Sequence, residues 1–241
     1  MPVTEIALAL GIDEVREQVL EGFQGVLLTD KVRSRGKILV NSARGSKPAR
    51  FGIAHELGHF LMERHVLGME RGFLCSEADM QQSRTAKLHD KQESEANAFA
   101  IALLAPNSLI APMLSADPSI EVVRSHAQLL DLSLEATTRC LIDRHDEPLA
   151  AIWTKDGIIR FIVRNERFPW INRDLRQKVS ALSRTSDVIS NGALTTTEMQ
   201  EVAPAAWTNA DLPELFEQVR LIRDGHALTL LWATLPESEE D

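Results

Sequence analysis

Residues 55–59 read His55-Glu56-Leu57-Gly58-His59, and this pentapeptide decides the fold and the chemistry expected of the chain. On a helix, two histidines four residues apart lie on one face, so their imidazoles can bind one metal ion. Glu56 stands beside the first histidine and is suited to take a proton from a water molecule at that metal. The motif predicts Zn2+ as the cofactor, His55 and His59 as ligands, and Glu56 as the catalytic base.

The sequence around the motif predicts a buried helix. Residues 50–64 contain no proline, and their apolar side chains cover most of the helix circumference. Two histidines and a glutamate in such a helix need a reason, because burying polar groups costs free energy unless they are paired. A plainer interpretation is a core helix with two hydrogen-bonded histidines, but the carboxylate between them favours the metal site. The pattern is typical of metal-dependent peptidases.

A catalytic zinc ion needs a third protein ligand, and two residues are candidates. His65 has the spacing of a longer signature, but Met62 stands where that signature has a helix-breaking glycine. Glu93 lies in a second predicted helix, 91–105, one turn before Asn97. Asn97 is suited to accept a hydrogen bond from a ligand imidazole and so to fix its tautomer. A solvated acidic helix start is the plainer explanation of Glu93, yet beside the motif the pattern favours Glu93 over His65.

Two motifs together resemble a known family. The first is the pentapeptide at 55–59, and the second is Glu93-Ser94-Glu95-Ala96-Asn97-Ala98-Phe99-Ala100, followed by Leu103-Leu104-Ala105-Pro106. Over roughly residues 20–145 the chain resembles the ImmA/IrrE family of metallopeptidases. The resemblance implies a zincin-like fold with a zinc ion held by His55, His59 and Glu93, and Glu56 as general base. It also implies a protein substrate, typically a DNA-binding helix-turn-helix repressor, whose cleavage regulates transcription in a stress response.

The expected architecture is α+β with two domains. Residues 1–146 are expected to form the zincin-like metallopeptidase domain, with strands at 25–29 and 37–41 and a helix-turn-helix-like pair within 118–145. The pair is open to two interpretations, a DNA-binding element or a pair packed against the peptidase core. Its second helix has only Arg139 and Arg144 as basic residues, which favours packing.

Residues 147–241 are expected to form a smaller α+β domain with a regulatory or substrate-binding role. Hairpins are predicted at Asp156-Gly157 and at Asp224-Gly225, each between two apolar runs. A helix is predicted around 174–183 and a frayed acidic tail at 236–241. The segment offers no catalytic constellation.

Composition favours a cytoplasmic enzyme. The chain has 241 residues, of which 44% are hydrophobic, enough to bury the core of two domains. Two cysteines suggest no disulfide framework, and the N-terminus lacks the basic start and long apolar run of a signal peptide. The longest apolar run, 98–105, is too short for a membrane span. We therefore expect no membrane partner.

Charge bears on the partners. Residues 31–50 carry seven Lys or Arg and no acidic residue, but the whole chain has a net charge of −9, so direct nucleic-acid binding is not expected. The chain has no tyrosine, which leaves His65, His89 and Arg50 as candidates to stabilise an oxyanion. Two histidines and one carboxylate also suit manganese or iron.

An alternative function, of another class, is that of a regulatory module that binds proteins through a zincin fold without cleaving them. The presence of Glu56 argues against it, because a scaffold needs no catalytic base. A DNA-binding regulator acting through the helix pair is a third hypothesis, and the acidic net charge weighs against it.

Overall fold

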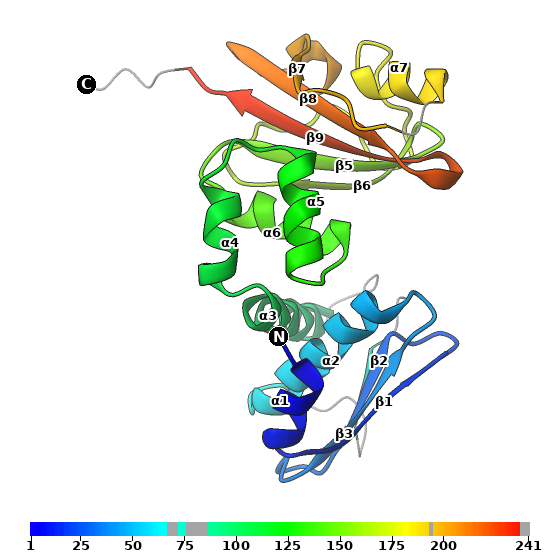
Figure 1. The fold of residues 1–241 in the computed structure, drawn as a ribbon, viewed down its shortest axis with the longest axis vertical. Coiled ribbons are helices and arrows are strands. Elements are labelled where there is room, and N and C mark those ends of the chain that lie inside the picture. Colours follow the sequence, from blue (N-terminus) through cyan, green and yellow to red (C-terminus); the bar gives the residue numbers. More distant parts are fainter. Residues whose placement is uncertain (67–71, 76–85, 193–194, 237–241) are drawn as a thin grey trace, which may run out of the picture. The chain divides into compact units, whose positions relative to one another are not determined.

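The computed structural model describes residues 1–66, 72–75, 86–192 and 195–236 (Figure 1). The chain forms two compact units. The first comprises Met1–Ile110 with Gln128–Ser133, and the second comprises Ala111–Ala127 with Leu134–Asp241. Each unit contains helices and one sheet, which is consistent with the expected α+β class.

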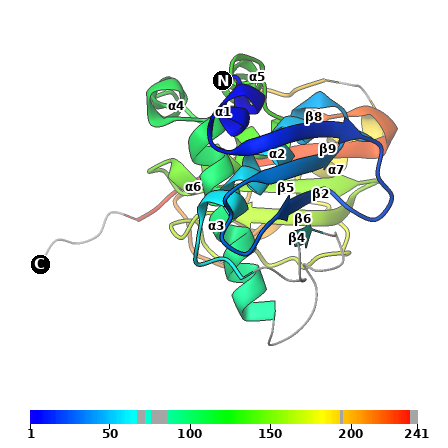
Figure 2. The ribbon, with the colours of Figure 1, turned by 90° about the horizontal axis from the view of Figure 1, so that it is seen from below.

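The first unit is built on a four-stranded mixed sheet in the order β1-β3-β2-β4 (Figures 1 and 2). β1 is parallel to β3, and the other neighbouring pairs are antiparallel. The predicted strands at 25–29 and 37–41 are confirmed as a pair, whereas β1 was not predicted because most of its side chains are polar and at least partly exposed. The strands are β1 (Ile12–Gln18), β2 (Gly25–Thr29), β3 (Gly36–Asn41) and β4 (Gly72–Cys75).

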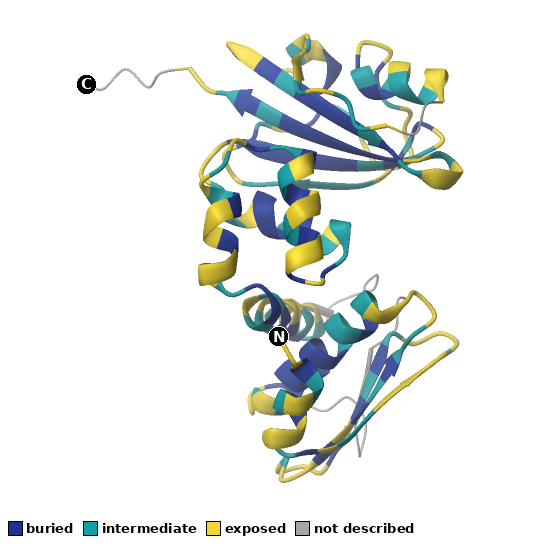
Figure 3. Ribbon diagram, viewed as in Figure 1, coloured by how far each residue is buried: buried dark blue, intermediate teal, exposed yellow. Residues whose placement is uncertain are grey.

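The first unit also contains three helices that pack against the sheet or against each other. They are α1 (Val3–Ala9), α2 (Ser46–Leu61) and α3 (Ala86–Leu104). α2 packs on β2 and β3, and α3 packs against α2. The middle of α2 is buried, as the sequence predicted (Figure 3). Gly58 permits the close approach of α3, because a Cβ at this position would lie only 3.1 Å from Cδ1 of Phe99.

The end of α2 differs from the prediction. The helix stops at Leu61, where the sequence predicted continuation to residue 64, and Met62 adopts an extended conformation (φ −90°, ψ 92°). A tight turn follows, in which the amide of His65 donates to the carbonyl of Met62 at 2.9 Å. Tertiary contacts override helix propensity here, since Arg33 donates to the carbonyl of His65 and the His65 side chain is buried. The turn therefore brings the His65 side chain to His59 on the helix that has just ended.

The second unit contains a five-stranded antiparallel sheet in the order β6-β5-β9-β8-β7 (Figure 1). Both predicted hairpins are confirmed, and their turns use left-handed residues such as Asp156 (φ 52°) and Gly157 (φ 75°). The strands are β5 (Leu149–Lys155), β6 (Ile158–Arg164), β7 (Gln200–Glu201), β8 (Glu214–Leu221) and β9 (His226–Thr234).

The predicted helix pair occurs as α5 (Ile120–Leu129) and α6 (Leu134–Arg144). α6 packs on β5 and β6 of the second unit, and the Arg139 guanidinium lies 3.9 Å from the ring centroid of Phe161. The division into units therefore departs from the expected boundary after residue 146, because most of this pair belongs with the second sheet. The preceding helix, α4 (Asn107–Leu114), contains the point at which the chain passes from the first unit to the second.

A third helix of the second unit, α7 (Arg184–Asn191), lies just after the stretch 174–183 in which a helix was predicted. That prediction is wrong, because the capping groups lie later in the chain. The side chain of Ser183 accepts a hydrogen bond from the amide of Ser186, and Gly192 ends the helix in the left-handed conformation (φ 68°). Two short 3-10 helices, Pro204–Ala206 and Arg223–Gly225, complete the described elements.

The Glu217 carboxylate joins α7 to the sheet. Its side chain is fully buried and accepts hydrogen bonds from the backbone amides of Arg184 (3.1 Å) and Thr185 (2.8 Å). The Thr185 hydroxyl (2.6 Å) and the indole nitrogen of Trp207 (2.9 Å) donate to the same group. A buried carboxylate surrounded by four donors is the kind of satisfied polar centre that a core tolerates.

Within the described parts of the chain, no single helix is long and apolar enough to cross a membrane. The stretch from His89 of α3 to the end of α4 is apolar, but the two helices meet at a bend of 86°. Ala96, Ala100 and Leu104 of α3 are fully buried, as in a core helix.

Candidate metal centre

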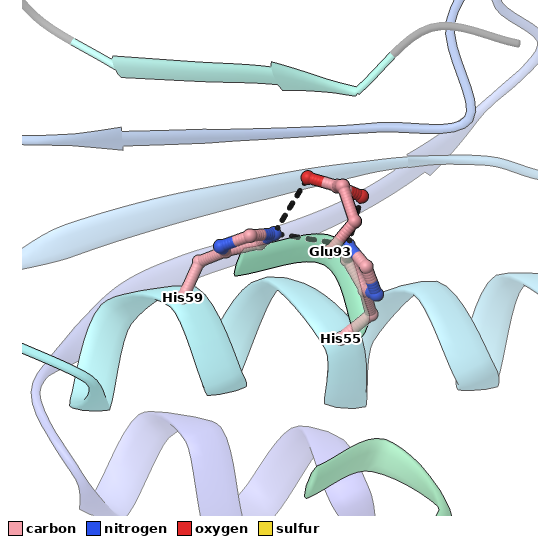
Figure 4. Close-up of side chains that lie close together, drawn as sticks. All are labelled: His55, His59 and Glu93. Atoms are coloured by element: carbon pink, nitrogen blue, oxygen red, sulfur yellow. Dashed lines mark hydrogen bonds and ion pairs between the residues drawn. The ribbon is translucent and has the colours of Figure 1, made fainter. Parts of the chain in front are cut away.

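Three side chains of the first unit converge on one point: His55 and His59 from α2, and Glu93 from α3 (Figure 4). The Nε2 atoms of the two histidines are 3.0 Å apart. The two Glu93 carboxylate oxygens lie 3.2 Å from Nε2 of His55 and 3.2 Å from Nε2 of His59. The structure thus brings together the three residues that the sequence predicted as ligands.

The donor set fits a metal ion. Ligands bound tetrahedrally to zinc at about 2.0–2.1 Å are separated by roughly 3.3 Å, close to the spacing of these atoms. The side chains are also shielded, with exposed fractions of 11% for His55, 0% for His59 and 15% for Glu93. Two imidazole nitrogens and one carboxylate leave a fourth position open, as catalytic zinc sites require. The same donors also suit iron or manganese.

The charge state of the three residues follows from burial and from their mutual contacts. Burial lowers the pKa of His59 to about 4, so this imidazole is neutral near pH 7. Burial also acts to lower the pKa of His55, but the hydrogen bond with Glu93 and the charges of Glu56 and Glu93 outweigh it, and the pKa is raised. Burial favours a protonated Glu93, yet its close contacts with both histidines hold its pKa below the ordinary value. Glu93 is therefore a carboxylate.

The outer nitrogen of His55 contacts Asn97, the residue to which the sequence assigned this contact. Nδ1 of His55 lies 2.9 Å from the amide oxygen of Asn97, which accepts its hydrogen. In the neutral ring with its hydrogen on Nδ1, the lone pair of Nε2 points into the site. α3 thus supplies both Glu93 inside the site and Asn97 behind it.

Glu56 is buried on the side of α2 that faces β2, with an exposed fraction of 1%. Its carboxyl group lies against Gly25, where an added Cβ would come within 3.2 Å of Cδ and closer still to Oε1. The absence of a side chain at Gly25 gives the carboxylate its place. The charge of Glu56 also acts on His55, whose pKa it raises.

His65 and Glu95 contact each other behind the site, and this pairing was not predicted from the sequence. Nδ1 of His65 lies 2.9 Å from Nδ1 of His59, and its Nε2 lies 3.0 Å from Oε2 of Glu95. His65 therefore contacts the outer face of a predicted ligand and is not a third ligand itself. A histidine six residues after the motif and a second glutamate close to Glu93 were the available signals, but only the turn after Leu61 brings them together.

The structure also gives the positions of Arg50 and His89, the other two candidates for oxyanion stabilisation. The Arg50 guanidinium donates to the carbonyls of Leu130, Asp131 and Met1, at 2.9–3.0 Å, so it is committed elsewhere. His89 lies one turn before Glu93 on α3, and its Nδ1 is 3.5 Å from Oε1 of Glu93. Of the three candidates, His89 is the one placed beside the ligand carboxylate.

Comparison with known proteins gives the family. The family model described as the IrrE N-terminal-like domain, Peptidase_M78, matches residues 10–141, which is more than half of the chain. The chain belongs to this family, as the two sequence motifs predicted, and the family suggests a metallopeptidase. The matched region includes the whole candidate site and extends into the helices of the second unit.

No curated protein matches the sequence. One solved structure, the crystal structure of the E. coli DhaR(N)–DhaL complex, aligns with 97% of this chain and 84% of that chain. The sequence identity is 13% and the TM-score is 0.25, a likeness too low to support any statement about fold or function.

Proposed function

We propose that the protein is a zinc-dependent endopeptidase that cleaves a regulatory protein, and that its substrate is a helix-turn-helix transcriptional repressor. The observation that carries the proposal is the convergence of the His55, His59 and Glu93 donor atoms, which all lie within 4.8 Å of one another, with Glu56 following the first of them. Membership of the IrrE N-terminal-like family supports the peptidase class.

Each residue has a role that its place supports. His55, His59 and Glu93 would hold the ion, and Asn97 orients the His55 imidazole through its Nδ1–H. A bound zinc ion supplies a Lewis acid that polarises a peptide carbonyl and acidifies water. Glu56 accepts a proton on its carboxylate and returns it to the departing amine nitrogen. His89 lies beside Glu93, and we propose that it donates a hydrogen bond to the substrate.

The repressor as substrate rests on the resemblance to the ImmA/IrrE family. Cleavage of such a repressor would release transcription in a stress response. The second unit, with its antiparallel sheet and no predicted catalytic group, is proposed to serve substrate binding or regulation.

Three glutamate-to-glutamine substitutions test the proposal. Zinc content is measured by elemental analysis, and cleavage is followed by mass spectrometry after co-expression with helix-turn-helix repressors encoded beside the gene. Glu56→Gln should retain about one zinc per chain and lose cleavage by at least about 100-fold, because it removes the base and leaves the ligands. Glu93→Gln should lose zinc and cleavage together. Glu63→Gln, an exposed site on the turn after α2, is the matched control and should change neither.

Two outcomes would contradict the proposal. Absence of zinc from the unaltered protein would remove its basis. Full biological activity of Glu56→Gln would favour the non-catalytic binding module instead.

A further inference from the structure

We propose that His65 and Glu95 are positioning residues that hold the His59 imidazole in the tautomer able to bind a metal ion. The inference rests on the proposed metal centre and adds to it a chain of two residues behind one ligand. The group of converging donor atoms contains neither residue.

The contacts form a continuous line from the site to the surface. The imidazoles of His59 and His65 are both fully buried, and their Nδ1 atoms lie 2.9 Å apart. The far nitrogen of His65, Nε2, lies 3.0 Å from Oε2 of Glu95, whose side chain is 22% exposed. Arg64, at the surface, donates to the same Glu95 oxygen at 3.0 Å. Arg33 holds the His65 backbone through its carbonyl.

The hydrogen positions along this line follow from the carboxylate at its outer end. Glu95 is acceptor-only when ionised, so Nε2 of a neutral His65 must carry the hydrogen. Nδ1 of His65 is then the acceptor, and Nδ1 of His59 must be the donor. A neutral His59 protonated on Nδ1 has its lone pair on Nε2, the atom that faces Glu93 and His55. The carboxylate therefore selects the tautomer of the ligand through one intervening imidazole.

Both imidazoles are fully buried, and a buried site disfavours a charged ring. Two neutral rings can orient each other's hydrogens from Glu95 to His59 without placing a free charge in the core.

The two histidines of the motif are thus held by different kinds of partner. Behind His55 stands the amide of Asn97, a neutral acceptor at 2.9 Å. Behind His59 stands an imidazole that is itself polarised by a carboxylate, an arrangement that raises the basicity of the ligand nitrogen. We expect zinc affinity to fall more when the partner of His59 is removed than when the partner of His55 is removed.

Two substitutions of similar volume at His65 test the inference. Asn carries an amide oxygen near the position of Nδ1 and can still accept from His59, whereas Leu cannot. Zinc affinity is measured by competition with a chromogenic chelator, with thermal unfolding of the metal-free protein alongside. His65→Leu should weaken zinc binding by about 10–100-fold, and His65→Asn should recover most of that loss. The metal-free His65→Leu protein should be no less stable than His65→Asn, because leucine suits a buried position better.

Glu95→Ala provides a second variant that leaves the buried ring in place. It should also weaken zinc binding, by less than His65→Leu. Arg64→Gln is its matched control, because Arg64 contacts the same carboxylate from the exposed side and should leave the affinity unchanged.

The outcomes separate this inference from the proposed function. Zinc bound by the unaltered protein and bound equally well by His65→Leu or Glu95→Ala would overturn the positioning role alone. Equal weakening by Leu and Asn at residue 65, in step with lost stability, would also overturn it. A protein that binds no zinc in any form would overturn both proposals.

Discussion

Nδ1 of His55 lies 2.9 Å from Oδ1 of Asn97, although 42 residues separate the two in the chain. The contact exists because α3 packs against α2, with Gly58 leaving room for Phe99 between them. Glu93 stands one turn before Asn97 on the same helix and faces the same histidine at 3.2 Å. One helix therefore supplies the group that contacts each ring nitrogen of His55.

Substitution of Asn97 should weaken metal binding without removing it. Asn97→Leu deprives Nδ1 of His55 of its acceptor, so the ring can rotate or change tautomer, and zinc affinity should fall by about tenfold or more. Asn97→Asp keeps an acceptor at the same place and should retain most of the affinity. Chelator competition measures both. Equal affinity in Asn97→Leu and the unaltered protein would contradict the assigned contact.

Gly25→Ala should impair catalysis and spare the metal site. The added Cβ would collide with the Glu56 carboxyl group, which must then move from its place against β2. We expect a fall in turnover of about tenfold or more, with zinc content unchanged, since general-base catalysis contributes about 100–10,000-fold and depends on position. Leu28→Ala, an exposed site on the same strand, is the control. Unchanged turnover in Gly25→Ala would argue against Glu56 as the base.

Acid should destabilise the metal-free protein through His59. Its pKa is about 4 in the folded state and near 6.5 when unfolded, because burial disfavours the charged form. Between these values the unfolded chain takes up a proton that the folded chain does not, so the free energy of unfolding falls as the pH is lowered. The loss is absent above pH 6.5 and approaches at most about 3 kcal/mol near pH 4.

Urea unfolding at a series of pH values measures this effect, and His59→Gln isolates it. The variant should lose most of the slope between pH 6.5 and 4, while His226→Gln, at an exposed position, should keep it. Two neighbours contribute to both profiles. Glu93, whose pKa is lowered, adds a loss below its ordinary pKa. His55, whose pKa is raised, adds stability only as the pH falls from that raised pKa to the unfolded value near 6.5, above the range in which His59 acts. An unchanged slope in His59→Gln would refute the assignment.

Glu217→Ala should be among the most destabilising substitutions in the second unit. It would leave two backbone amides, the Thr185 hydroxyl and the Trp207 indole without their buried acceptor. Each unsatisfied buried donor costs about 1–3 kcal/mol, so we expect a loss of at least about 3 kcal/mol in the free energy of unfolding. Glu214→Ala, exposed on the same strand, should cost less than about 0.5 kcal/mol. Chemical denaturation of the metal-free protein compares the two variants.

The elements that could be predicted from sequence are those with local signals. The hairpin at Asp156-Gly157 follows from turn residues that tolerate positive φ, and the buried course of α2 follows from apolar residues on all its faces. The polar strand β1 carried no such signal, because it is ordered by its parallel pairing with β3. α7 was placed too early, because its start depends on Ser183 and on Glu217, 32 residues beyond Thr185.

The sequence by itself determined the family and the candidate ligands. His55 and His59 are fixed relative to each other by the geometry of one helix, and Glu93 with Asn97 by the geometry of another. Only the tertiary structure decided what stands behind His59. Helix propensity continues α2 through Met62, whereas the folded chain turns there and returns His65 to the ligand, with Glu95 beyond it. Contacts between segments, and not local preference, set that turn, because burial of the His65 ring and the Arg33 hydrogen bond outweigh one further turn of helix.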